Sequence, residues 1–149
     1  MITEHSVVIN RPINDVFAIV SNLENMSHYE AFAMAGRKTS DGPIGPGTTF
    51  EVTGKMLFWK IRTTLEVIEW QAGRNFTLKT ASSPVAAQTK YIFESVNEGT
   101  RLTLIDDTQF GGLLKFLEPL LANYSRKRFK TDMNNMKAYL ESPASQRAH

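Results

Sequence analysis

Residues 48–110 alternate between two kinds of side chain with a period of two almost throughout. From Trp59 to Val67 the odd-numbered positions are mostly apolar, and the even-numbered positions between them carry Lys, Arg, Thr or Glu. This alternation predicts strands with one covered and one solvent-facing side. Short connections rich in Gly, Pro and Asn separate the segments, so we expect consecutive strands to pair antiparallel in a meander.

The elements expected upstream and within this meander follow the chain in a simple order. Thr3 to Asn10 alternates and predicts a first strand, and Pro12 is well placed to open a short helix over Ile13–Val20. A second short helix or turn is expected over Asn22–Tyr29. The later strands are expected over Phe32–Ser40, Thr48–Lys55, Phe58–Trp70, Asn75–Ala81, Val85–Val96 and Thr100–Phe110.

Gly111 to Glu141 predicts one long C-terminal helix. Its second half has an apolar stripe on one helical face, formed by Phe129, Met133, Met136 and Leu140. Its first half carries Leu and Phe almost all the way round, which predicts burial on more than one side. Pro119 cannot donate a backbone hydrogen bond, so we expect a kink or a restart there, with Pro119 in the first turn of the main segment.

Length and composition limit the class of protein. The 149 residues predict a single domain over residues 1–141, followed by a disordered tail over residues 142–149. The absence of cysteine excludes disulfides, thiolate metal sites and a cysteine nucleophile. A net charge of +2 gives no reason to expect a nucleic-acid partner. The N-terminal residues do not have the pattern of a signal peptide, and a cytoplasmic location is expected.

Several local motifs accompany this order of elements. They are Val7-x-Ile9-x-x-Pro12-x-x-x-Val16-Phe17, Gly45-x-Gly47-Thr48-x-Phe50, Glu66-Val67-x-Glu69-Trp70 and Tyr91-x-Phe93-Glu94-x-x-x-x-Gly99-Thr100-Arg101-Leu102-Thr103. Together they resemble the START-like (SRPBCC) superfamily over about residues 2–141, and most closely its bacterial polyketide cyclase/dehydrase-like branch. The resemblance implies an α+β helix-grip fold, in which a curled antiparallel sheet of six to seven strands wraps around the long C-terminal helix.

The resemblance also implies a hydrophobic cavity between the sheet and the C-terminal helix. Aromatic walls with a few hydroxyl groups suit a flat or lipid-like ligand. The alternative for the aromatic residues is simple packing in the core. The residues expected to contact a ligand are Tyr29, Phe50, Trp59, Thr63, Phe76, Tyr91, Asp106, Leu117 and Tyr124.

Two residues are candidates for catalysis. Alternation places Asp106 on the covered side of its strand, where it could bind a polar group of a ligand or act as a general acid or base. Alternatively, it lies in water at the open end of the strand or pairs with a lysine or arginine. His5 is expected on the covered face as a hydrogen-bonded core or rim residue, or as a catalytic base, whereas His28 is expected at the surface. No histidines have metal-ligand spacing and no catalytic triad can be argued, so neither a metal nor a cofactor is expected.

The basic run on the predicted helix consists of Arg126, Lys127, Arg128 and Lys130. It is interpreted as a solvated helix face, or alternatively as a surface for transient contact with anionic lipid headgroups.

Three functions remain open at the level of sequence. The first is a carrier or binding protein for a small hydrophobic molecule such as a lipid, quinone, isoprenoid or polyketide-like aromatic, with Pro119 and Gly111-Gly112 giving the helix freedom to move. The second is a cyclase/dehydratase-type enzyme without a metal or covalent nucleophile. The third is a protein-interaction or chaperone co-activator module. A smooth apolar cavity would favour the carrier, convergent polar groups the enzyme, and a filled core the module. The oligomeric state is left open.

Overall fold

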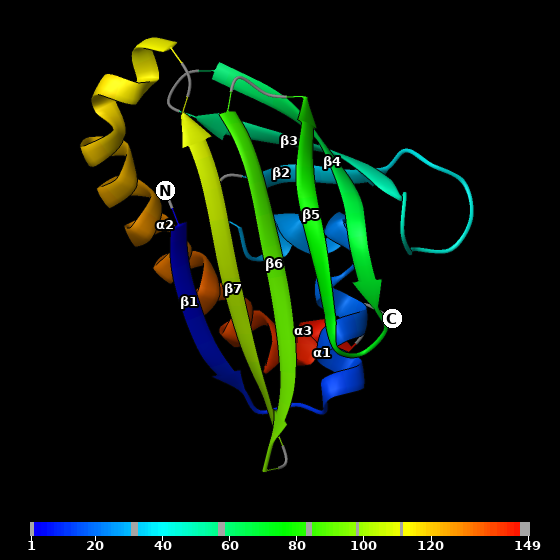
Figure 1. Cartoon of the computed structure of the whole chain (residues 1–149). Coiled ribbons are helices and arrows are strands. Elements are labelled where there is room, and N and C mark those ends of the chain that lie inside the picture. Colours follow the sequence, from blue (N-terminus) through cyan, green and yellow to red (C-terminus); the bar gives the residue numbers. More distant parts are fainter. Residues whose placement is uncertain are drawn as a thin grey trace.

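The computed structural model describes residues 2–30, 33–56, 59–82, 85–97, 99–110 and 112–146. Within these residues, seven strands form one antiparallel sheet (Figure 1). The strands are β1 (Ile2–Ile9), β2 (Ala33–Lys38), β3 (Thr49–Met56), β4 (Trp59–Gln71), β5 (Asn75–Ser82), β6 (Val85–Val96) and β7 (Gly99–Phe110). The helical elements are α1 (Ile13–Val20), the 3-10 helices η1 (Leu23–His28) and η2 (Gly112–Leu117), α2 (Glu118–Leu140) and α3 (Pro143–Gln146).

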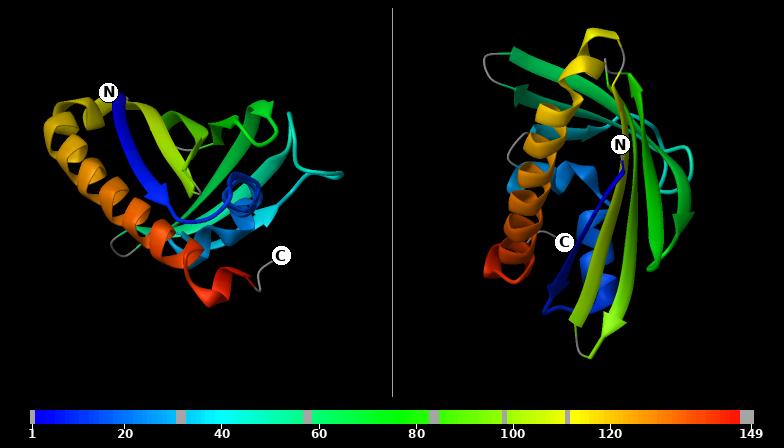
Figure 2. Two further views of the ribbon diagram at one scale, coloured as in Figure 1. Left: turned by 90° about the horizontal axis from the view of Figure 1, so that it is seen from below. Right: turned by 60° about the vertical axis from the view of Figure 1, so that its left-hand side comes forward.

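The strand order is β1-β7-β6-β5-β4-β3-β2. Strands β2 to β7 therefore form the expected meander, and the first strand pairs with the last, for example Val7 opposite Leu102. The two views in Figure 2 show a strongly curled sheet with α2 lying along one side of it and α1 and η1 near its concave face. This arrangement confirms the predicted α+β helix-grip fold.

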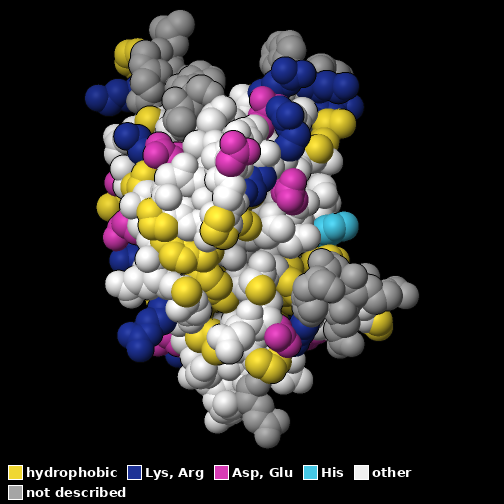
Figure 3. Space-filling model, turned by 90° about the vertical axis from the view of Figure 1, so that its right-hand side faces the viewer, with side chains coloured by type: hydrophobic (Ala, Val, Ile, Leu, Met, Phe, Trp, Pro, Cys, Tyr) yellow, Lys and Arg dark blue, Asp and Glu magenta, His cyan; other side chains and the backbone are white. Residues whose placement is uncertain are grey.

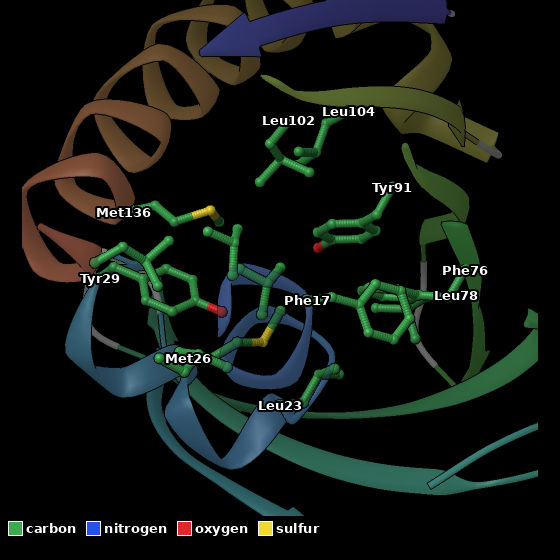
Figure 4. Packing of buried hydrophobic residues seen from close by; sticks show 14 of the residues in the cluster. Phe17, Leu23, Met26, Tyr29, Phe76, Leu78, Tyr91, Leu102, Leu104 and Met136 are labelled. Atoms are coloured by element: carbon green, nitrogen blue, oxygen red, sulfur yellow. The ribbon is translucent and has the colours of Figure 1, made fainter. Parts of the chain in front are cut away.

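The core lies where α1 meets the concave face of the sheet. Val16 and Val20 of α1 are fully buried, as the apolar spacing predicts. The Phe17 ring meets the Phe93 ring edge-on at a centroid distance of 4.9 Å. The Phe17 ring also meets the Phe76 ring edge-on at a centroid distance of 5.8 Å, and Figure 4 shows both residues among the packed side chains of the core.

The C-terminal helix differs from the single long helix that was expected. Residues Gly112–Leu117 form η2, and α2 begins at Glu118 with Pro119 in its first turn, which confirms the restart at Pro119. The expectation that the first half is buried on several sides is wrong for the described side chains, because Phe116 is 84% and Leu120 72% exposed. The start of the chain contacts the second half of α2, at Phe129, Lys137 and Leu140.

The C-terminal end of α2 is anchored by hydrogen bonds to the start of the chain. The buried guanidinium of Arg11 donates to the Leu140 carbonyl oxygen at 3.2 Å and to the Ser145 hydroxyl at 2.9 Å. Ser145 lies in α3 and is fully buried. Part of the segment expected to be a disordered tail is therefore folded against Arg11. None of the helices within the described residues is both long and apolar enough to cross a membrane.

Candidate functional site

A cavity of about 140 Å³ lies between α2 and the concave face of the sheet. One part of its wall is apolar and is formed by Met26, Val52, Leu65, Leu78, Ala87 and Phe129. The other part carries polar groups and is formed by Glu30, Thr63, Thr80, Thr89, Tyr91 and Arg128. The cavity is therefore neither smooth and apolar nor filled by the core.

Strand alternation explains how the sheet contributes to this wall. Side chains two residues apart point to the same side of a strand. Ala87, Thr89 and Tyr91 of β6 accordingly all face the cavity, and Thr63 and Leu65 of β4 do so from the neighbouring part of the curl, although a bulge interrupts part of that strand's pairing. The sheet thus presents hydroxyl groups in an otherwise apolar surface.

Glu30 reaches the cavity from the end of η1. This 3-10 helix packs closely on β2. Only glycine fits at position 36, since any side chain there would collide with the backbone carbonyl oxygen of Leu23. Burial raises the pKa of the Glu30 carboxyl to about 7, with a smaller increase from Asp132 and an opposing decrease from Arg128. Glu30 can therefore hold or release a proton near neutral pH.

Arg128 faces the same cavity from α2. Its Nε atom lies 3.6 Å from Oδ2 of the buried Asp132, one helical turn farther along. The side chain of Arg128 is 30% exposed, so the guanidinium stands at the border between the cavity and solvent. Of the four basic residues interpreted as a solvated face, Arg126, Lys127 and Lys130 are exposed, whereas Arg128 lies beside the apolar stripe and reaches the cavity.

Two buried tyrosines add hydroxyl groups to this region. Figure 4 shows Tyr29 and Tyr91 with their hydroxyl oxygens directed toward the interior between η1 and the sheet. Burial, followed by the charge of Glu30, raises the pKa of both hydroxyls well above the usual range. Both tyrosines are therefore neutral hydrogen-bonding groups at physiological pH, and neither can serve as a base.

Asp106 is buried on the covered face, as alternation predicts. One carboxylate oxygen accepts a hydrogen bond from the Thr89 hydroxyl at 2.7 Å, and the other accepts one from the Thr108 hydroxyl. The expected alternatives of an open strand end or a basic partner are both wrong, because threonine hydroxyls satisfy this carboxylate. Thr89 lines the cavity, so Asp106 is hydrogen-bonded to a residue of the cavity wall.

His5 and His28 have different surroundings. The His5 ring stacks on Phe129 with a centroid distance of 5.4 Å, and its buried Nε2 atom has no hydrogen-bond partner among the described residues. His5 therefore packs against Phe129, a residue of the cavity wall. Its Nε2 atom does not form the hydrogen bond that was expected of a core or rim histidine. His28 is exposed, as expected, and stacks on Tyr139.

The other predicted ligand-binding residues fall into three groups. Phe50 and Phe76 are fully buried in the core, and Phe76 stacks on Tyr91 at a centroid distance of 4.4 Å. Leu117 and Tyr124 are 48% and 57% exposed, so the expectation that they face the cavity is wrong. The backbone of Trp59 begins β4, but its side chain lies outside the described residues.

Sequence reasoning missed Glu30 and the inward position of Arg128. Arg128 could have been found, because Arg128 and Asp132 are four residues apart and flank the stripe of Phe129 and Met133. Glu30 follows a 3-10 helix and belongs to no repeating pattern. Only the packing of η1 on β2 brings its carboxyl to the cavity.

The sequence matches one family model over residues 2–141, that of polyketide cyclase / dehydrase and lipid transport proteins. The chain belongs to this family. The family lies within the START-like (SRPBCC) superfamily, so the resemblance drawn from the motifs is confirmed. A comparison with curated proteins found no match.

Several solved structures share the fold of this chain at low sequence identity. Protein TTHA0849 from Thermus thermophilus has a TM-score of 0.80 at 14% identity, with 94% of this chain and 97% of that chain covered. The Zhui aromatase/cyclase from a Streptomyces species has a TM-score of 0.78 at 13% identity, with 95% and 93% covered. Protein NE0264 from Nitrosomonas europaea has a TM-score of 0.77 at 14% identity, with 100% and 97% covered. Identities this low establish the shared fold alone.

Proposed function

We propose that this member of the family binds a small, largely apolar molecule bearing an oxygen-containing group in the cavity between α2 and the sheet. The observation that carries the proposal is the two-sided wall of this cavity. Apolar side chains can cover a ring or short chain, and the Tyr91 hydroxyl, Glu30 and Arg128 can fix one polar group. A few placed polar groups in an apolar pocket are what orients a ligand in such sites.

The size of the cavity narrows the ligand class. A dry cavity of about 150 Å³ holds one benzene-sized molecule, and the cavity here is about 140 Å³. Pockets for drug-sized ligands begin at roughly 300 Å³. A single-ring phenol or quinone therefore fits without rearrangement, whereas a long lipid, an isoprenoid or a multi-ring polyketide requires α2 to move away from the sheet.

A cavity-filling variant tests the binding site. Ala87 lines the cavity, and its neighbour Ala86 is exposed. We expect p-cresol to bind the unmodified protein in calorimetry, Ala87→Met to weaken this binding by tenfold or more, and Ala86→Met to leave it unchanged. Native mass spectrometry of the purified protein would identify a ligand that it already carries. Absence of binding by p-cresol, 1-naphthol and fatty acid alike, or equal binding by Ala87→Met, would contradict the proposed site.

A cyclase/dehydratase-type enzyme is the second candidate, and the presence of Glu30 and Arg128 in the wall of the same cavity favours it. The Glu30 carboxylate would take a proton from the carbon next to a ligand carbonyl, while the Arg128 guanidinium donates hydrogen bonds to the developing enolate oxygen. In a β-hydroxy ketone, the protonated Glu30 would then return the proton to the leaving hydroxyl, so that water departs and a carbon–carbon double bond remains.

Hydrogen exchange separates this enzyme from a carrier. We expect an enzyme to exchange the methyl protons next to the carbonyl of 4-methylacetophenone for deuterium in D₂O, a reaction followed by NMR, and Glu30→Gln to abolish the catalysed exchange while p-cresol still binds. Binding of the ketone without catalysed exchange would support the carrier function and contradict the enzymatic one.

The interaction module has less support. Large apolar side chains exposed on the described strands are scattered, at Ile2, Val8, Met34 and Ile68. Figure 3 shows hydrophobic side chains grouped across the middle of one face, with other side chains and backbone around them. The densest exposed apolar group lies on the C-terminal helical segment instead of the sheet.

A further inference from the structure

The beginning of α2, together with the end of η2, exposes four large apolar side chains close together in sequence. Phe116 is 84%, Leu120 72%, Tyr124 57% and Leu117 48% exposed. We refer to these four residues as the apolar end of α2. Exposed apolar side chains are ordinary when they are single, but a group of this kind on one element indicates an interaction surface.

Helical spacing places these residues on the outer face of α2. Leu120 and Tyr124 are four residues apart and share one side of α2, and Phe116 and Leu117 precede them at the end of η2. The buried stripe that begins at Phe129 faces the opposite direction, toward the sheet. The apolar end of α2 is thus a continuous outward surface and does not belong to the cavity.

Several basic side chains lie near this surface along the chain. The exposed basic side chains are those of Lys115, Arg126, Lys127 and Lys130. Among the described side chains of residues 115–131, one is acidic, that of Glu118. A groove beside it is lined by Lys115, Phe116, Glu118, Pro119, Ala122 and Arg126. The surface therefore combines protruding apolar side chains with a positive rim.

We propose that the apolar end of α2 docks on the surface of an anionic lipid bilayer. Phe116 and Leu120 would enter the boundary between headgroups and acyl chains, and the lysines would remain at the headgroups with their aliphatic stems buried. The positive charge around the apolar residues favours an anionic membrane over a second copy of the chain. A second copy of the chain would bring equal positive charges face to face, whereas anionic headgroups complement them.

This proposal is independent of the ligand in the cavity. The docking residues and the cavity residues do not overlap, because Arg128 and Phe129 are the residues of α2 that line the cavity. A failure of p-cresol to bind would leave the docking surface intact, and a failure of docking would leave the cavity intact.

Vesicle flotation tests the apolar contribution. We expect the protein to float with vesicles of phosphatidylcholine containing 30% phosphatidylglycerol and to remain unbound with phosphatidylcholine alone. The Phe116→Ser/Leu120→Ser variant should lose roughly tenfold or more of this binding, because two buried apolar side chains are removed. The matched control is Met34→Ser/Ile68→Ser, which removes two exposed apolar side chains of β2 and β4, at 50% and 38% exposure, and should bind normally.

Charge reversal tests the basic contribution. Each basic side chain near an anionic surface is worth about fivefold in binding, so Lys127→Glu/Lys130→Glu should lose roughly 25-fold or more. Lys55→Glu/Lys60→Glu, which changes exposed lysines on β3 and β4, is the control and should bind normally. Raising the salt concentration from about 0.1 M to 0.5 M should weaken the binding of the unmodified protein.

Three outcomes would overturn the proposal. The first is no binding to the anionic vesicles. The second is equal loss in the target and control variants, which would indicate nonspecific adhesion. The third is a concentration-dependent dimer in light scattering that Phe116→Ser/Leu120→Ser abolishes, because the surface would then bind a second copy. Circular dichroism would show that each variant is folded before its binding is compared.

Discussion

The two halves of α2 belong to one continuous helix but have opposite surroundings. In the second half, Met133 and Met136 are each 3% exposed and Leu140 is completely buried. In the first half Leu120 is 72% exposed, although leucine is at least as apolar as methionine. The difference shows that the number of apolar residues does not determine burial. A one-sided stripe meets the core, whereas apolar residues distributed around a helix are covered only where another element reaches them.

The hydrogen bonds of α2 show the same asymmetry. Its C-terminal end is bonded to the N-terminal part of the chain through Arg11, and also through Lys137, whose Nζ atom donates to the Val8 carbonyl oxygen at 2.8 Å. The carboxylate of Glu141 accepts a hydrogen bond from the Asn10 backbone N–H at 2.8 Å. These contacts span most of the sequence, so the second half of α2 is a structural part of the domain.

The largest expected effect comes from truncating the buried half. Leu140→Ala should lower the free energy of unfolding by about 3 kcal/mol, because it leaves a cavity in the core. Leu120→Ala, the same change in the exposed half, should alter it by less than about 0.5 kcal/mol. Urea unfolding followed by circular dichroism measures both. Similar losses in the two variants would mean that the halves do not differ as described.

An intermediate effect is expected at Glu30, which faces α2 across the cavity. Its pKa is about 7 in the folded protein, against 4.5 ordinarily. Because the unfolded chain gives up this proton more readily, stability falls as pH rises from about 4.5 to 7 and then stays level. Because Glu30 is only half-buried, solvent screens part of this shift, and Glu30→Gln should raise the free energy of unfolding by about 2 kcal/mol at pH 8 and have little effect at pH 4.

Urea unfolding at several pH values checks this expectation. Glu24→Gln changes an exposed carboxyl on η1 and is the matched control. A destabilised Glu30→Gln variant at pH 8 would show that the carboxylate is well satisfied when charged. That result would also remove the physical basis for a proton-transfer role of Glu30.

The smallest effect is expected at Asp132, on the buried side of α2. Its charge raises the pKa of the Glu30 carboxyl, and its carboxylate also pairs with Arg128. Asp132→Asn should therefore lower the pKa of Glu30 by up to about one unit, equivalent to ~1.4 kcal/mol. NMR titration of the labelled Glu30 carboxyl measures this, with Asp41→Asn as an exposed control. An unchanged or higher pKa would mean that the charge of Asp132 does not raise the pKa of Glu30.

Most of the fold could be predicted because its causes are local. Alternation from Thr48 onward determines which side of each strand is covered, and Pro119 determines where the last helix restarts. The exposed start of that helix could not be predicted in this way. Its burial depends on how far the sheet and η1 extend along α2, which is a property of the assembled domain.

The cavity was predicted less completely for the same reason. Thr63 and Tyr91 lie at the cavity, since strand alternation assigns them to the covered side. Tyr124 was misplaced because its role was inferred from its chemistry, whereas its position on the helix is opposite the buried stripe. Glu30 required the close approach of η1 to β2, and no spacing in the sequence encodes that contact.

The anchoring of α2 at its C-terminal end makes the helix a lever with its pivot near Leu140. At a rise of about 1.5 Å per residue, Phe129 lies ~16 Å and Leu120 ~30 Å from this pivot. A tilt of about 5° would then move Phe129 by ~1.5 Å and Leu120 by nearly twice as much. A displacement applied to the far end of the helix would thus be transmitted to the cavity at about half its amplitude, widening or narrowing the space beside Phe129.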